Sequence, residues 1–316
     1  LPPIMKKNQL LIIFFLVFIN YISSQNNEIK LLVEKTEKLN LDMWELSEFA
    51  EKNLKNEDDK ARFFYYWIGK NIEYDYEFLR KMDIEENIHE EYLKKQDEYR
   101  VYEDRKGICA GYANLFTWFM LEADIEVENI SGHIRDERNH YVELHSDDFR
   151  HAWNAIKLNG EWKLVDTTWG TSNEDSESKF YFDIKPELAI NTHYPENSKW
   201  QLLEKPLSLE EFNNSKFVKL VWFFSGFTDI PNLKKDNNYY YFVYKTNNEN
   251  RNLSVELMIS KDNLNYETIE NTVKIEQDGI TYVRFEKSKI PEKAFYKVHL
   301  LENDYIIYSN VLSFKT

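Results

Sequence analysis

The sequence contains very little cysteine and little glycine. Cys109 is the single cysteine among 316 residues, which excludes a disulfide within the chain and a zinc site built from several cysteines. Any role of Cys109 must rest on packing or on the reactivity of its thiol. The eight glycines spell neither GxGxxG nor GxxxxGKS/T. We therefore expect no nucleotide-binding loop, and we predict no cofactor.

Positive charge is also in short supply. The chain has 55 acidic and 40 basic residues and a net charge of -15. This balance removes the electrostatic basis for binding nucleic acid or anionic lipid, so neither is an expected partner. Hydrophobic residues make up 42% and aromatic residues 16%, enough to form cores. The length predicts about two domains.

The long apolar run lies near the start of the sequence. Lys6 and Lys7 precede apolar residues 10–19, and a polar stretch with small residues follows at 20–25. This is the pattern of a secretory signal peptide cleaved after Ser24. A membrane anchor needs about 20 apolar residues, and a buried helix is the other alternative. We predict an exported protein (secreted, periplasmic or at the cell surface) without stable membrane insertion after removal of the leader.

Two kinds of pattern divide the remaining chain. Residues 29–52 and 59–72 show helical spacing of apolar positions, with Asn56 near a cap, and residues 83–104 are typical of a solvated helix and connector. Short aromatic and β-branched runs, separated by turn residues, follow after residue 215. They predict strands at 217–224, 239–244, 253–259, 272–275, 280–285, 294–300 and 305–314. This spacing is typical of an immunoglobulin-type β-sandwich.

Cys109 stands where a turn leads into a helix. The sequence GICAGYANLF contains Cys109 between Gly107 and Gly111, which allow backbone or substrate to approach closely. At the first turn of a helix, unpaired amides and the positive end of the dipole favour the thiolate, the nucleophilic form. The alternative is a small buried side chain, as most unpaired cysteines are.

A hairpin carries a histidine and an aspartate. Residues 151–158 and 161–168 flank Asn159-Gly160, a strong signal for a two-residue turn. Because side chains alternate along strands, His151 and Asp166 share one face and are diagonal neighbours. Asn154 falls on the other face, which disfavours it as a partner for the imidazole. We expect the face with His151 to pack on the helix that bears Cys109.

Thiol, imidazole and carboxylate together suit nucleophilic catalysis. The cysteine attacks, the histidine transfers the proton, and the aspartate fixes the orientation of the imidazole. The alternative is a structural His151–Asp166 hydrogen-bonded pair beside the hairpin.

Three motifs resemble those of the transglutaminase-like superfamily: GICAGYANLF, HAWN at 151–154 and DTTW at 166–169. The stretches KFYF at 179–182, HYPE at 193–196 and WQLL at 200–203 are similar to its kyphoscoliosis peptidase branch. The resemblance spans about residues 60–210. It implies a papain/transglutaminase-like α+β core at 26–212, followed by an all-β immunoglobulin-like sandwich at 213–316. It also implies Cys109 as nucleophile, His151 as acid/base and Asp166 as orienting residue.

We therefore predict an enzyme that acts on amide bonds of proteins or peptides, with hydrolysis by a peptidase or amidase ranked first. A crosslinking transglutaminase and a non-catalytic adaptor that binds protein or cell-wall peptide are the alternatives. The backbone amide of Cys109 is a natural oxyanion donor, and Trp67 and Tyr74 are candidate side-chain donors. Substrate identity and oligomeric state are not predicted.

Weaker patterns carry no prediction of a site. The histidines and aspartates at 133, 140, 145, 147, 148 and 151 match no metal-ligand spacing, and the acidic run 83–91 lacks the glycine of an EF-hand loop. We predict no metal. Trp222, Tyr239, Tyr240 and Tyr241 suit a carbohydrate or peptide surface, but aromatic strand residues are more often core or cross-strand pairs.

Overall fold

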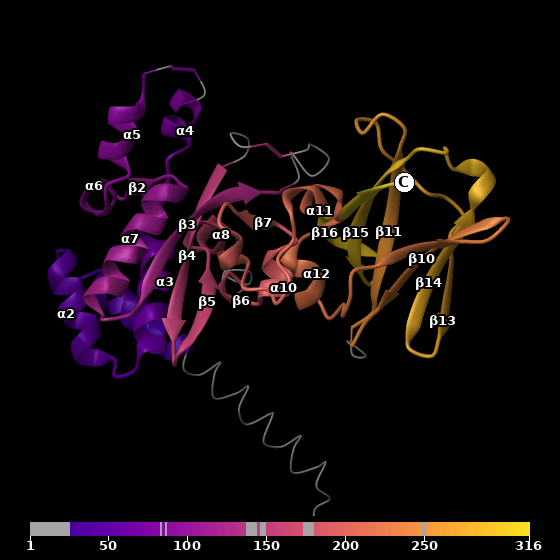
Figure 1. The fold of residues 1–316 in the computed structure, drawn as a ribbon. Coiled ribbons are helices and arrows are strands. Elements are labelled where there is room, and N and C mark those ends of the chain that lie inside the picture. The colour runs from indigo at the N-terminus through magenta and orange to yellow at the C-terminus, as the bar shows by residue number, and fades with distance from the viewer. Residues whose placement is uncertain are drawn as a thin grey trace, which may run out of the picture. The chain divides into compact units, whose positions relative to one another are not determined.

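A computed structural model describes residues 26–82, 84–85, 87–136, 144–145, 150–172, 180–247 and 251–316 (Figure 1). The chain divides into two compact units. One consists of Leu1–Ile130 and Ala152–Asp183, the other of Ser131–His151 and Ile184–Thr316. The predicted boundary at residues 212/213 stays a prediction. The predicted leader, residues 1–25, lies outside the described residues. Within the described part of the chain, no helix has the length and apolar character of a membrane span.

The first helices are shorter than the sequence pattern predicts. Residues 26–36 are helical, and α2 (Met43–Asn53) is a separate helix, so the single helix predicted over 29–52 is wrong. The break follows from the side chain of Asp42, which accepts from the Glu45 backbone N–H at 2.8 Å and forms a capping box. Helix α3 (Glu57–Asn71) begins after Asn56, which caps it as predicted.

A short connecting region leads to the helix that carries the cysteine. It contains β1 (Glu73–Tyr74), α4 (Tyr76–Met82), α5 (His89–Lys95), α6 (Glu98–Asp104) and β2 (Lys106–Gly107). The solvated helix predicted over 83–104 is thus two short helices, and α5 buries none of its residues. Strands β1 and β2 pair in parallel, with Tyr74 opposite Gly107. Helix α7 (Cys109–Glu122) follows directly.

A mixed region of sheet and helix comes next. Strands β3 (Val127–Ile134), β4 (Arg150–Leu158), β5 (Glu161–Val165), β6 (Phe182–Ile184) and β7 (His193–Pro195) form a sheet of order β6-β5-β4-β3-β7. The β4–β5 hairpin has the predicted register, with Leu158 opposite Glu161. Its turn residues Asn159 and Gly160 have φ of 52° and 83°, as a two-residue turn requires. Helix α8 (Thr167–Ser172) follows β5.

The C-terminal region is mainly antiparallel sheet. Before it lie α10 (Pro186–Ala189), η1 (Ser198–Gln201) and α11 (Leu209–Asn214). One sheet has the order β13-β14-β10-β9 and the other β12-β11-β15-β16-β8. The strands are β8 (Phe217–Val218), β9 (Asn232–Lys235), β10 (Tyr239–Lys245), β11 (Leu253–Ser260), β12 (Glu267–Thr268), β13 (Val273–Gln277), β14 (Ile280–Glu286), β15 (Phe295–Glu302) and β16 (Tyr305–Lys315). The predicted α+β core followed by a β-sandwich is confirmed.

One predicted strand of this region is wrong. Residues 217–224 form the two-residue β8 and then helix α12 (Leu220–Phe224). A short continuous apolar run has no periodicity that separates a strand from a buried helix. Trp222 of this helix is fully buried among core residues that include Phe242 and Tyr296. Trp222 therefore belongs to the core, as its sequence context favours.

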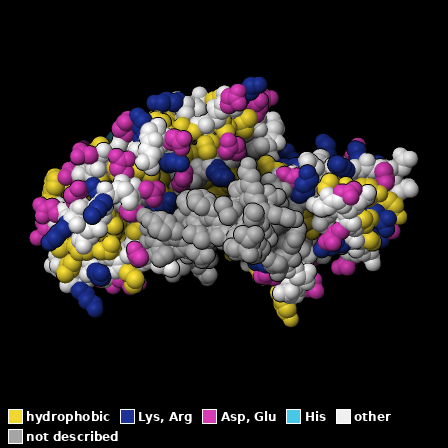
Figure 2. Space-filling view, turned by 90° about the horizontal axis from the view of Figure 1, so that it is seen from below, with side chains coloured by type: hydrophobic (Ala, Val, Ile, Leu, Met, Phe, Trp, Pro, Cys, Tyr) yellow, Lys and Arg dark blue, Asp and Glu magenta, His cyan; other side chains and the backbone are white. Residues whose placement is uncertain are grey.

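The surface mixes charges of both signs. On the face shown in Figure 2, acidic and basic side chains are interspersed over the described residues. Many pair locally, as Arg100 does with Asp104 at 3.1 Å on α6. Exposed pairs of this kind contribute about 0–1 kcal/mol each. The fold therefore depends mainly on its buried cores.

Candidate active site

Cys109 is the first residue of α7 and is half-buried. The preceding residue, Ile108, has extended backbone and provides no side-chain cap. The first turn of the helix thus has no hydroxyl or carboxylate cap from its N-cap residue, and its dipole favours negative charge at that end. This is the position that the sequence predicts for a reactive thiol.

A buried glutamine fixes the start of α7. The Ile108 backbone N–H donates to Gln96 Oε1 at 3.0 Å, and Asn114 Nδ2 donates to the Gln96 carbonyl at 2.8 Å. A Cβ at Gly111 would lie 2.6 Å from Gln96 Oε1 and 2.7 Å from Val101 Cγ2. The close approach predicted at this glycine is therefore made by side chains of the preceding helices, and its effect is to seat the helix start.

Strand β4 contacts α7 through Asn154. This side chain is fully buried, and its Nδ2 donates to the Ala113 carbonyl at 3.2 Å and to Thr117 Oγ1 at 3.0 Å. The prediction that the opposite face of the hairpin packs on this helix is wrong. Asn154 lies on the other face and makes two hydrogen bonds with the helix, so that face of β4 meets α7. Asn154 is engaged with the helix, which agrees with its exclusion as partner of the imidazole.

Hydrogen bonds between β4 and the residues around α7 give the direction of the strand relative to the helix. Farther along β4, the Lys157 backbone N–H donates to the carbonyl of Glu126, which follows the C-terminal end of α7. The strand therefore runs toward the C-terminal end of the helix.

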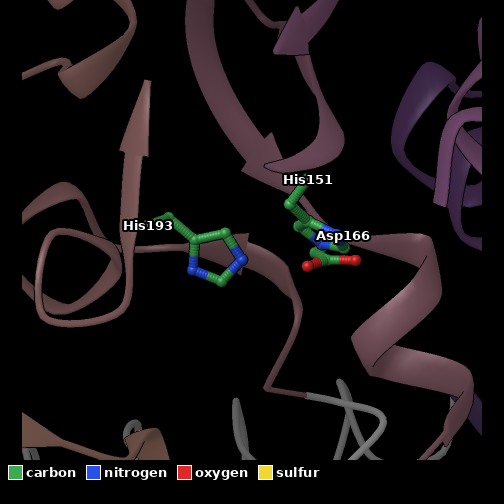
Figure 3. Close-up of side chains that lie close together, drawn as sticks. All are labelled: His151, Asp166 and His193. Atoms are coloured by element: carbon green, nitrogen blue, oxygen red, sulfur yellow. The ribbon is translucent and has the colours of Figure 1, made fainter. Parts of the chain in front are cut away.

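His151 and Asp166 are close together and buried (Figure 3). His151 is 6% exposed and Asp166 0%. A third residue, His193 of β7, joins them, and one donor atom from each of the three lies within 4.8 Å of the others. His193 Nδ1 lies 2.8 Å from Thr192 Oγ1. Cys109 is not a member of this cluster, which we call the His–Asp–His cluster.

Asp166 is held from several directions. It follows β5, and its Oδ1 accepts from the Trp169 backbone N–H at 2.9 Å, so it caps α8. Its own N–H donates to the Tyr181 carbonyl at 2.9 Å. The motif DTTW thus combines the end of a strand with the start of a helix, where the sequence predicts a strand alone. One carboxylate oxygen thus accepts a hydrogen bond from the backbone of the helix.

A buried tyrosine lies behind Asp166. Burial, followed by the nearby Asp166 charge, raises the pKa of Tyr65 well above its usual range. A Cβ at Gly170 would lie 1.7 Å from Tyr65 Oη, so the glycine makes room for this ring in α8. Tyr65 of α3 therefore packs closely against α8, near enough to Asp166 for the carboxylate charge to affect the pKa of the tyrosine.

Sequence reasoning missed His193 as a member of the site. The HYPE motif contains His193, but nothing near this motif in the sequence indicates that the histidine lies beside His151 and Asp166. Strand β7 pairs with β3, far from the hairpin in sequence, and this pairing brings His193 to His151 with ring centroids 5.7 Å apart. Of the weaker metal pattern, His140, Asp147 and Asp148 lie outside the described residues.

The cluster also has the residue types of a metal site. Donors around a tetrahedral zinc ion lie about 3.3 Å apart, since each is about 2.0 Å from the metal. The donor atoms of the cluster all lie within 4.8 Å of one another. An imidazole beside a buried carboxylate is equally the arrangement of a general acid/base with its orienting residue. The residue types of the cluster therefore suit acid–base chemistry as well as metal binding.

Comparison with known proteins identifies the class. Residues 46–167 match the model of the transglutaminase-like superfamily. This segment, which contains Cys109, His151 and Asp166, is transglutaminase-like.

The chain is similar to kyphoscoliosis peptidases of mouse, 34% identical over 176 residues, and of human, 32% identical over 176 residues. Each match covers 53% of this chain and 25% of the relative. Hillarin of Drosophila melanogaster is 30% identical over 103 residues, which are 27% of this chain and 13% of that protein. The chain thus spans about a quarter or less of the length of these relatives.

Proposed function

We propose that the protein is a cysteine-dependent acyl-transfer enzyme acting on amide bonds of proteins or peptides, with hydrolysis as its main reaction. The observation that carries this proposal is the buried pair of His151, from β4, and Asp166, which follows β5, in a chain whose single cysteine begins α7. The transglutaminase-like family and the peptidase relatives support it.

The proposed reaction has two steps. The Cys109 thiolate attacks the amide carbonyl carbon, the C–N bond breaks, and His151 donates its proton to the departing amine. Water then attacks the thioester and gives its proton to His151, which releases a carboxylic acid and restores the thiolate. Asp166 accepts the other N–H of the imidazole and stabilises its charged form.

The backbone N–H of Cys109 is the proposed first donor to the oxyanion. The two candidate side-chain donors differ in position. Trp67 is buried in the core and stacks on Tyr102 with ring centroids 5.1 Å apart. Tyr74 pairs in register with Gly107, two residues before the cysteine. We favour Tyr74 as the second donor for this reason.

The reaction type is tested with a general protein substrate and a labelled primary amine. We expect new amino termini or free acid, little amine incorporation, and loss of both in Cys109→Ala. Incorporation of the amine that exceeds hydrolysis and requires Cys109 would contradict the hydrolase preference and favour crosslinking. Binding of peptide by a protein that is inactive in every assay would instead favour the adaptor.

We also propose that the protein is exported, on the pattern of residues 6–25. Expression of the whole chain in a secreting host should give a protein in the medium that begins at Gln25. Leu16→Lys interrupts the apolar run and should keep the protein inside the cells. A mature protein that retains residues 10–19 would contradict cleavage.

A further inference from the structure

The edge strand β13 is exposed on both faces. It stands at the end of the sheet order β13-β14-β10-β9 and pairs only with β14 among the described strands. All five of its residues are exposed, including two large apolar ones, Val273 at 42% and Ile275 at 36%. An edge of this kind offers backbone donors and acceptors to another strand.

The hairpin geometry determines which backbone groups point outward. Strands β13 and β14 are joined by Asp278-Gly279, both with positive φ, and Gln277 faces Ile280 across the turn. In a two-residue hairpin the flanking pair is hydrogen-bonded, and hydrogen-bonded pairs then alternate along the ladder. Residues 273, 275 and 277 therefore bond to β14. Lys274 and Glu276 present their N–H and C=O groups to solvent.

The side chains of this strand have a self-complementary order. Lys274 and Glu276 lie on one face, and Lys274 Nζ is 2.7 Å from Glu276 Oε1. If a second copy of the strand runs antiparallel with its centre at Ile275, Lys274 faces Glu276 of that copy and Glu276 faces its Lys274. On the other face the two Ile275 side chains meet. Both outward-facing residues then form hydrogen-bonded pairs, and Ile275 forms the closer, non-hydrogen-bonded pair.

We propose that β13 is a docking edge for a second copy of this chain, joined antiparallel about Ile275. Charged residues on an edge strand usually prevent pairing with other chains. Here the two opposite charges are placed symmetrically about the central residue, so they repel most strands but match a copy related by a two-fold axis. A five-residue edge is smaller than the roughly 1,000 Å² interface of a stable complex. The dimer is therefore weak and concentration-dependent.

Disulfide trapping tests the predicted register. In a Cys109→Ser background, Ile275→Cys should form a crosslinked dimer under mild oxidation, because the paired Cα atoms lie about 4.5 Å apart. Val273→Cys is the matched control on the same face. In this register its two copies lie about 13 Å apart, beyond the reach of a disulfide. No crosslink at 275, or equal rates at 273 and 275, would overturn the proposal.

Charge reversal tests whether the partner strand is a second copy of β13. In the Ile275→Cys background, Lys274→Glu or Glu276→Lys alone should slow crosslinking about tenfold, because each creates two like-charge pairs. The double variant with both substitutions restores opposite charges and should recover the original rate within about twofold. Slowing in the double variant as well, or no slowing in the single variants, would show that the strands do not pair in this way.

Discussion

Asp166 combines a structural and a chemical role in one side chain. It caps α8 through Oδ1 and belongs to the His–Asp–His cluster. Burial in a helix cap holds the carboxylate in one orientation, which is what an orienting residue requires. The close contact between Gly170 and Tyr65 supports the same helix from behind.

Gly170→Ala should destabilise the protein by about 1–3 kcal/mol, because the new methyl group collides with a fully buried ring. Urea unfolding measures the change. Gly160→Ala is the control for loss of glycine in the same region, since nothing lies within 4 Å of its Cβ and its cost is that of positive φ alone. If Gly170→Ala has wild-type stability, Tyr65 does not restrict this position.

At the scale of elements, the contact between β4 and α7 determines where the site residues lie. Asn154 links the two elements through two acceptors of the helix, Ala113 O and Thr117 Oγ1. The Asn154 side chain is fully buried, so its removal deletes two hydrogen bonds and leaves a cavity between the strand and the helix.

Asn154→Ala should lower the free energy of unfolding by about 1–3 kcal/mol and also lower the rate of amide cleavage, because β4 carries His151. Thr117→Val removes one of the two acceptors and should lower the free energy of unfolding by a smaller amount. In the double variant the two effects should not add, since the pair shares one contact. Additive effects in urea unfolding would mean that this hydrogen bond contributes nothing.

Local sequence patterns predicted many of the turns, strand pairings and helix ends. The Asn159-Gly160 turn, the hairpin register, the Asn56 cap and the start of α7 at Cys109 all follow from short-range rules. Long-range packing did not follow. Strand alternation defines the two faces of a hairpin, but it does not determine which face packs on a helix. Here the face with Asn154 packs on α7. His193 was not predicted because it reaches the site through the pairing of β7 with β3, two strands that are distant in sequence.

Over the whole molecule, tyrosines with raised pKa values contribute to the loss of stability at high pH. Burial raises the pKa of Tyr244 to about 12, and it also raises the pKa values of Tyr65 and Tyr296. An unfolded tyrosine loses its proton near pH 10. Between pH 10 and 12 the unfolded state therefore binds fewer protons than the folded state, and stability falls as pH rises.

Each such tyrosine should cost about 1.4 kcal/mol per pH unit above pH 10. Tyr244→Phe should thus show a shallower loss of stability between pH 9 and 11.5 than wild type, measured by urea unfolding at each pH. Below pH 9 the two proteins should keep a constant difference in stability. Equal slopes above pH 10 would contradict the raised pKa of Tyr244.

The central claim is that Cys109 is a nucleophile activated by His151. The rate of Cys109 alkylation by iodoacetamide, measured against pH in wild type and in His151→Ala, tests it most directly. The imidazolium stabilises the thiolate, so the midpoint in wild type should lie at or below neutral pH and should rise toward about 8.5 in the variant. A midpoint near 8.5 in both proteins would contradict the claim.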